Sequence, residues 1–97
     1  MKLMRSVHPG RHLAAELEDR GVSVAELAAA LSVNAGRIAD LVAGRSDLSP
    51  DLALRLGRWM GVDPEYWMRL DSHHRLVEAS KAPDLKLDAI TPAVDAA

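Results

Sequence analysis

Two arginines and a serine in the middle of the sequence, Arg37, Arg45 and Ser46, carry side chains suited to directed hydrogen bonding. A guanidinium can donate two parallel hydrogen bonds to guanine in the DNA major groove. Arg37 falls in the first turn of a predicted helix, which suits such a contact, although an exposed charge also fits there. Arg45 and Ser46 follow Gly44 and suit phosphate oxygens, which position a protein without specifying sequence. Simple solvation in a loop is the alternative for this pair.

Shorter residues complete the candidate DNA-binding surface. Asn34 can cap the predicted helix, and Ala35 can touch a thymine methyl although it cannot hydrogen-bond a base edge. Gly36 has two interpretations: it lets the backbone approach DNA closely, or it indicates weakened base reading. The amide end of the helix that follows Ser23 can bind a phosphate. The predicted DNA-binding residues are Ser23, Asn34, Ala35, Arg37, Arg45 and Ser46.

Two short helices, predicted at about 23–31 and 34–43, must position these side chains. The first opens with a capping box, in which Ser23 and Glu26 each satisfy the other's backbone amide. Gly44 can end the second helix in a left-handed conformation. Apolar residues at helical spacing bury one face of each helix against the other: Ala28, Leu31, Val33, Ile38 and Leu41. Such a pair is a helix-turn-helix, whose second helix can lie in the major groove.

Proline and glycine mark three further helices around this pair. They are predicted from Pro9 to Gly21, from Ser49-Pro50 to Gly61, and from Asp63-Pro64 to about Ser80. The sequence therefore predicts an all-α domain of five helices within residues 1–81. Residues 82–97 hold few apolar side chains and are predicted to form a flexible C-terminal tail.

Composition and charge narrow the class of protein. With 48% hydrophobic residues, the chain can bury a modest core. The net charge is −2, so any basic DNA-binding face would be thin, which favours a weak binder or one that gains affinity by dimerising. The lack of cysteine excludes a disulfide framework and a thiolate metal site. No apolar run approaches the ~20 residues of a membrane span, and no signal peptide is recognised, so we expect a cytoplasmic protein without membrane contact.

Neither catalysis nor a cofactor is expected. No Ser/His/Asp set, nucleotide-binding loop or carboxylate pair stands out. His8 and His12 have the four-residue spacing of metal ligands on a helix, but no acidic third ligand accompanies them and His8 precedes the predicted helix. His73 and His74 are adjacent and diverge on a helix, which favours a surface or interface role.

Three motifs resemble the HigA (VapI-like) antitoxins, a branch of the Xre/Cro helix-turn-helix family. The first is Val7-His-Pro-Gly-Arg-His-Leu-Ala-Ala-Glu-Leu17, with His-Pro-Gly before an amphipathic helix. The second pairs Ser23-Val-Ala-Glu-Leu-Ala28 with Ile38-Ala-Asp-Leu-Val-Ala-Gly44, and the third is Asp63-Pro-Glu-Tyr-Trp-Met-Arg-Leu70. The resemblance spans roughly residues 7–79. Val24 departs from it, because the family usually places Gln there.

The resemblance implies a lambda-repressor-like five-helix fold and a homodimer that binds operator DNA and represses its own operon. It also implies a partner, a HigB-type toxin of the RelE-like, mRNA-cleaving class. One alternative is a free-standing Xre-family repressor without a toxin. Another is an interaction module that has lost DNA binding, which the acidic balance, Ala35 and Gly36 favour.

The last predicted helix is the expected dimer interface. It is too long for four short helices to cover, and it carries Trp67, Leu70, Leu76 and Val77. The aromatic residues near its start, Trp59, Tyr66 and Trp67, fit core packing beside such an interface. In the tail, Leu85, Leu87 and Ile90 form a small apolar set that could become ordered on the toxin, for example by adding a strand to a sheet edge.

Overall fold

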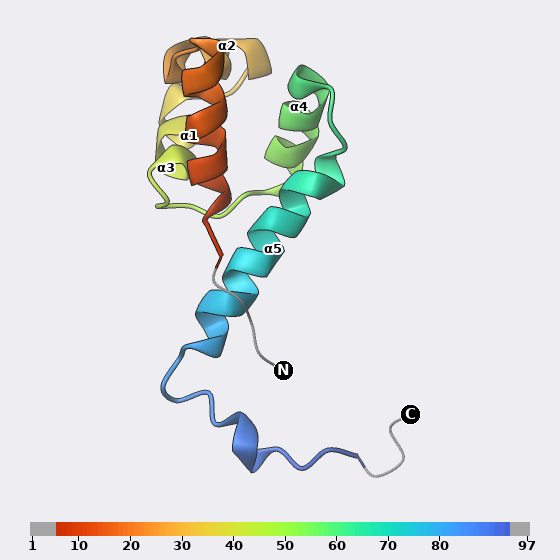
Figure 1. Cartoon of the computed structure of the whole chain (residues 1–97). Helices are drawn as coiled ribbons and strands as arrows, with labels where there is room; N and C mark the ends of the chain where they lie inside the picture. The colour runs from red at the N-terminus through yellow and green to blue at the C-terminus, as the bar shows by residue number, and fades with distance from the viewer. Residues whose placement is uncertain (1–5, 94–97) are drawn as a thin grey trace.

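Five α-helices and one short 3₁₀ turn make up the computed structural model, which describes residues 6–93 (Figure 1). No strand occurs within this range. The elements are α1 (Pro9–Arg20), α2 (Val24–Leu31), α3 (Ala35–Val42), α4 (Pro50–Met60), α5 (Pro64–Ser80) and η1 (Leu87–Ala89). The predicted all-α, five-helix architecture and its helix boundaries are confirmed.

Side chains cap the start of every α-helix, which explains why the boundaries could be found from local sequence. Ser23 Oγ accepts from the Glu26 N–H, and Glu26 Oε1 accepts from the Ser23 N–H, so the predicted capping box is present. Ser49 Oγ accepts from the Leu52 N–H at the start of α4. An unexpected cap begins α1, where His8 Nδ1 accepts from the Gly10 N–H at 2.9 Å. These caps satisfy amides that have no partner within their helix.

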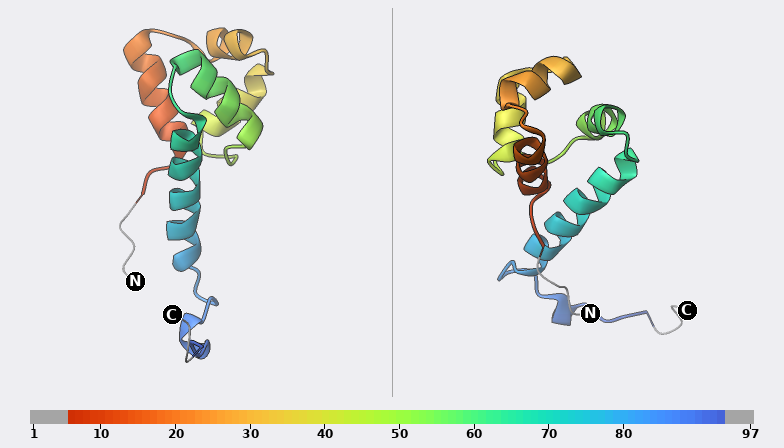
Figure 2. Two further views of the ribbon diagram at one scale, coloured as in Figure 1. Left: turned by 90° about the vertical axis from the view of Figure 1, so that its right-hand side faces the viewer. Right: turned by 45° about the horizontal axis from the view of Figure 1, so that its top comes forward.

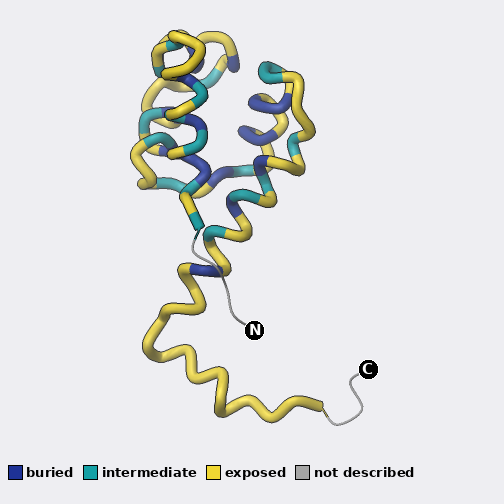
Figure 3. Tube along the Cα trace, in the orientation of Figure 1, coloured by how far each residue is buried: buried dark blue, intermediate teal, exposed yellow. Residues whose placement is uncertain are grey.

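The hydrophobic core lies where α1, α2 and α3 meet α4 and the first half of α5 (Figures 1 and 3). Its largest fully buried apolar side chains come from all five helices: Leu13, Leu27, Ile38, Leu41, Leu56 and Trp67. This core fixes the orientation of α3, whose opposite face is left in solvent.

A very close contact joins the start of α1 to the end of α3. A Cβ atom built on Gly10 would lie 1.7 Å from the Leu41 carbonyl oxygen. No side chain fits at that distance, so the two backbones can approach this closely only because residue 10 is glycine.

Helix α5 starts in the core and then extends away from the helical body, and the tail continues beyond it (Figures 1 and 2). Every residue from 78 to 93 is exposed, as Figure 3 shows. The helix ends at Ser80, where the sequence predicted its end. The flexibility of residues 82–97 stays a prediction, and residues 94–97 of this segment lie outside the described range.

Candidate nucleic-acid interface

A tight turn sets α3 against α2 with the amino-terminal end of α3 in solvent. Ser32 adopts a left-handed conformation with φ of 58°, and the Val33 N–H donates to the Ala28 carbonyl at 2.9 Å. Ile38 and Leu41 bury the inner face of α3. All four residues that begin the helix, Asn34, Ala35, Gly36 and Arg37, are exposed. The exposed end of α3 is therefore free to enter a groove of DNA.

Asn34 both caps α3 and keeps donor capacity. Its Oδ1 accepts from the Gly36 N–H at 2.7 Å, so the side-chain NH₂ points away from that bond. A Cβ atom built on Gly36 would meet only the Asn34 Oδ1, at 3.0 Å, which is the movable end of a side chain. Among the described residues, no close backbone contact of the fold demands glycine at this position.

Arg37 does not extend freely from α3; it folds back onto the start of α4. Its Nη2 donates to Ser49 Oγ at 2.7 Å, and its Nη1 lies 2.9 Å from Asp51 Oδ2. The side chain is still 40% exposed. The sequence prediction did not include this pairing, because the partners belong to another helix and no local spacing rule links them.

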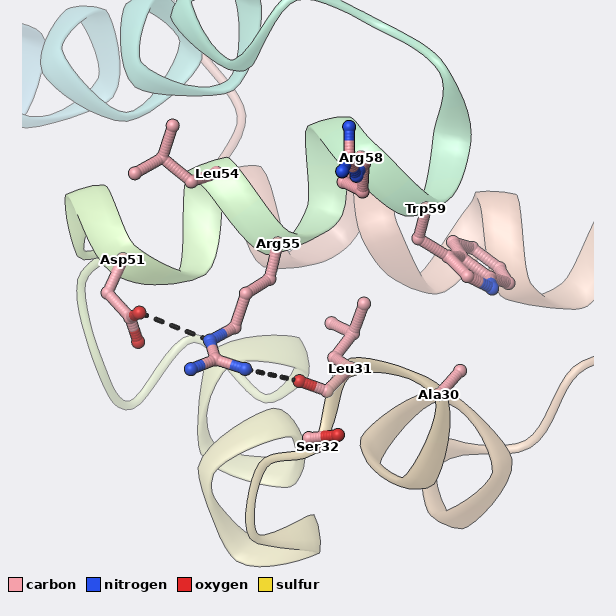
Figure 4. Close-up of a pocket in the computed structure, with 8 residues that line it drawn as sticks. All are labelled: Ala30, Leu31, Ser32, Asp51, Leu54, Arg55, Arg58 and Trp59. Atoms are coloured by element: carbon pink, nitrogen blue, oxygen red, sulfur yellow. Dashed lines mark hydrogen bonds and ion pairs between the residues drawn. The ribbon is translucent and has the colours of Figure 1, made fainter.

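Asp51 is shared with a second arginine. Its Oδ1 accepts from Arg55 Nε at 3.1 Å, and Arg55 Nη1 donates to the Leu31 carbonyl at the end of α2, at 2.7 Å (Figure 4). The hydrogen bonds from Arg55 and then from Arg37 hold the pKa of the Asp51 carboxyl below its usual value. This network connects α2, α3 and α4 through the exposed side chains of Arg37, Asp51 and Arg55 and the carbonyl of buried Leu31.

The second candidate arginine is also paired in the free protein. Arg45 Nε and Nη2 both donate to Asp40 Oδ1, at 3.2 and 3.0 Å. The pair is exposed, so it is weak and can be exchanged for a phosphate. Gly44 precedes it with φ of 77°, the left-handed conformation predicted for this position, and Ser46 is half-buried.

A buried carboxylate, which the sequence prediction missed, anchors the loop between α3 and α4. Asp71 in α5 is fully buried, and its Oδ1 accepts from the Leu48 N–H at 3.1 Å. Its Oδ2 forms an ion pair with Arg75 at 2.8 Å. A signal was available: Asp71 lies one helical turn after Trp67, on the face of α5 that the pattern predicts to be buried.

Two of the histidines form a pair different from the two pairs considered in the sequence. His8 packs edge-on against His74, with ring centroids 5.1 Å apart, and Ser6 Oγ lies 3.2 Å from His74 Nδ1. His8 Nδ1 is already the α1 cap. Within residues 6–93, no group of three or more His, Cys, Asp or Glu side chains is arranged to hold a metal ion.

The four residues predicted at the dimer interface differ in exposure. Trp67 and Val77 are buried within the protomer, at 2% and 3% exposure, so they have little surface left for a second copy. Leu70 is half-buried, and Leu76 is 51% exposed. The interface itself stays a prediction, and Leu76 is the member with the most free surface.

In the described part of the chain, no helix is long and apolar enough to cross a membrane.

Comparisons of the sequence and of the fold with known proteins find helix-turn-helix proteins and antitoxins. The helix-turn-helix family model HTH_3 matches residues 13–67. Virulence-associated protein I of Dichelobacter nodosus is 35% identical over 80% of this chain and 73% of its own length. An addiction module antidote protein of a HigA family from Coxiella burnetii is 33% identical, with a TM-score of 0.86 over 93% of this chain and all of that one. The Pseudomonas aeruginosa antitoxin HigA, solved with the higBA promoter, is 35% identical with the same TM-score and coverage.

Proposed function

This chain belongs to the HigA (VapI-like) branch of the Xre/Cro helix-turn-helix family, and from that membership we propose that it is an antitoxin that binds operator DNA as a homodimer. In this proposal it represses its own operon and neutralises a HigB-type, RelE-like mRNA-cleaving toxin. The observation that carries the DNA-binding part is the exposed amino-terminal end of α3, held by the core in a fold that a relative uses on promoter DNA.

In the proposed complex, α3 enters the major groove. Asn34, Ala35 and Arg37 face base edges there, while Arg45 and Ser46 contact phosphates from the following loop. The amide end of α2, after Ser23, adds a phosphate contact. Since the chain has a net charge of −2, affinity depends on these few positioned groups and on two half-sites acting together.

Dimerisation is proposed to use α5 and its extension beyond the helical body. Exposed Tyr66 and Leu76 support an apolar contact on this helix. A two-fold dimer would place two α3 helices about 34 Å apart, one turn of DNA. Sedimentation at tens of micromolar protein tests this proposal, and a monomer at all concentrations would contradict it.

Toxin binding is proposed to involve the tail. The exposed leucines and isoleucine of the tail, Leu85, Leu87 and Ile90, support a contact that buries them on a partner. Binding by the helical body alone is the competing arrangement.

Binding to the chain's own promoter region tests the DNA-binding part. We expect fluorescence anisotropy to give sequence-preferring binding that weakens steeply with salt. Absence of salt-dependent promoter binding would favour an interaction module that has lost DNA binding. Promoter binding without a RelE-like gene beside this one would favour a free-standing repressor.

A further inference from the structure

Asp51 accepts from two arginines at once, with one carboxylate oxygen for each. Oδ2 lies 2.9 Å from Arg37 Nη1, and Oδ1 accepts from Arg55 Nε at 3.1 Å. Asp51 lies in the first turn of α4, and its side chain is 53% exposed. It is therefore beside the candidate DNA-reading arginine, at the surface, and fixed by a second partner.

In the free protein, this arrangement engages one N–H group on each terminal nitrogen of Arg37. Nη1 is paired with Asp51 and Nη2 donates to Ser49 Oγ at 2.7 Å. A guanidinium that grips guanine uses two such N–H groups side by side. To hold a base with these same two N–H groups, Arg37 must leave Asp51 and Ser49.

Release of Arg37 leaves neither partner unsatisfied. Asp51 keeps its bond to Arg55, which is itself held by the Leu31 carbonyl at 2.7 Å. Ser49 Oγ still accepts from the Leu52 N–H. The lost ion pair is exposed to water, where such pairs are weak. The ion pair between Arg37 and Asp51 can therefore be exchanged for another contact of Arg37 at little cost in stability.

We propose that Asp51 is a positioning residue for operator recognition, which holds Arg37 against the start of α4 until a sequence offers it a better acceptor. The inference rests on the proposed DNA-binding function. On DNA without a matching guanine, Arg37 stays on Asp51 and adds little affinity. On the operator, the base replaces Asp51. Because Arg37 leaves Asp51 only on the operator, the ion pair weakens operator binding by its own strength and weakens binding to other sequences by no more than that.

Binding of four full-length proteins to an operator duplex and a scrambled duplex tests the proposal: wild type, Asp51→Asn, Arg37→Ala and the double variant. An exposed ion pair changes an equilibrium by about 1.5- to 5-fold, so Asp51→Asn should tighten operator binding by about that factor per half-site. Binding to the scrambled duplex should tighten by that factor at most, so the ratio of the scrambled to the operator dissociation constant stays the same or rises. In the Arg37→Ala background the same change should have no effect.

Asp47→Asn is the matched control, since it removes an exposed acid of the preceding loop, paired only loosely with Arg75 at 3.8 Å. Tightening by Asp51→Asn that persists without Arg37, or that Asp47→Asn reproduces, would mean a general charge effect and overturn the proposal. A lower melting temperature with weaker DNA binding would assign Asp51 to scaffolding, through Arg55, and overturn it too. If wild type binds neither duplex, the proposed function itself fails.

Discussion

The carboxylate of Asp71 in α5 accepts a hydrogen bond from the backbone N–H of Leu48, 3.1 Å away and fully inside the protein. Leu48 belongs to the loop that follows α3, the loop that also carries Arg45 and Ser46. The proposed dimer helix and the proposed phosphate-contacting loop are thus joined by a buried polar contact. Buried polar groups of this kind are costly to leave unpaired.

Asp71→Ala should therefore destabilise the protein and displace the loop. Leaving the buried Leu48 N–H without an acceptor costs about 1–3 kcal/mol, measured as the change in free energy of unfolding by urea. Asp71→Asn is the matched control, because its side-chain oxygen can still accept from Leu48. We expect a smaller loss for Asn and weaker operator binding for Ala. Equal unfolding free energies for wild type and the alanine variant would show that this hydrogen bond does not contribute to stability.

The contact between Gly10 and the Leu41 carbonyl predicts an unusual sensitivity at the start of α1. Because an added Cβ would lie 1.7 Å from a backbone oxygen, Gly10→Ala must push α1 and α3 apart. We expect a loss of at least about 1–3 kcal/mol in the free energy of unfolding, the usual cost of overpacking.

Gly36→Ala is the matched control for this substitution, since that glycine is exposed and faces only a movable side chain. Its unfolding free energy should stay within about 0.5 kcal/mol of wild type, as for most surface changes. Its operator affinity should fall if the backbone of α3 approaches DNA closely. A Gly10→Ala variant as stable as wild type would contradict the described packing.

The sequence was sufficient for the fold because each helix is marked by chemistry local to its ends. The caps depend on neighbours within three residues, as for Ser23 with Glu26, for Asn34, and for Ser49 before Pro50. The arrangement of the site was not predictable in the same way. The partner of Arg37 lies on another helix, and the acceptor for the Leu48 N–H comes from α5, so both depend on how the helices pack.

The sequence pattern also did not separate the buried from the exposed members of the set predicted at the dimer interface. Trp67 and Val77 share α5 with Leu76, and helical spacing alone did not separate inner from outer positions on a helix that only partly contacts the core. The burial of Trp67 follows from the packing of α5 against the other helices. Leu76 lies outside that contact and keeps about half of its surface exposed.

Acid should weaken the start of α2. The hydrogen bond from the Ser23 backbone N–H, with a smaller contribution from the Ser23 side chain, holds the pKa of Glu26 below its ordinary value of 4.5. A carboxyl whose pKa is lower in the folded state stabilises that state above the ordinary pKa and loses this effect as the pH falls through the lowered value. Melting temperatures of wild type should therefore fall below about pH 4.5 more steeply than those of Glu26→Gln, which cannot titrate. Parallel curves for the two proteins would exclude this contribution.

Arg37 and Arg45 should differ in what they do for DNA binding. Arg37→Ala should lose about 1–3 kcal/mol per half-site and relax sequence preference, because a base contact is removed. Arg45→Ala should weaken all sequences alike and reduce the slope of log affinity against log salt by about 1, because a phosphate contact is removed. Anisotropy titrations on operator and scrambled duplexes at several salt concentrations separate the two. Equal, sequence-independent losses would make Arg37 a phosphate contact.

Deletion of residues 82–97 tests the proposed role of the tail. The described part of this segment is exposed throughout, and it offers too few apolar groups to offset an ordering cost of about 1–2 kcal/mol per residue, so we expect it to be mobile in the free protein. On the toxin, burial of Leu85, Leu87 and Ile90 could repay that cost, as a strand added to a sheet edge would. The truncated protein should then bind toxin more weakly in calorimetry, while Leu87→Ser with Ile90→Ser in the full-length chain should reproduce the loss. Operator binding should survive in both variants, because α3 and α5 remain. An unchanged toxin dissociation constant after truncation would instead assign neutralisation to the helical body.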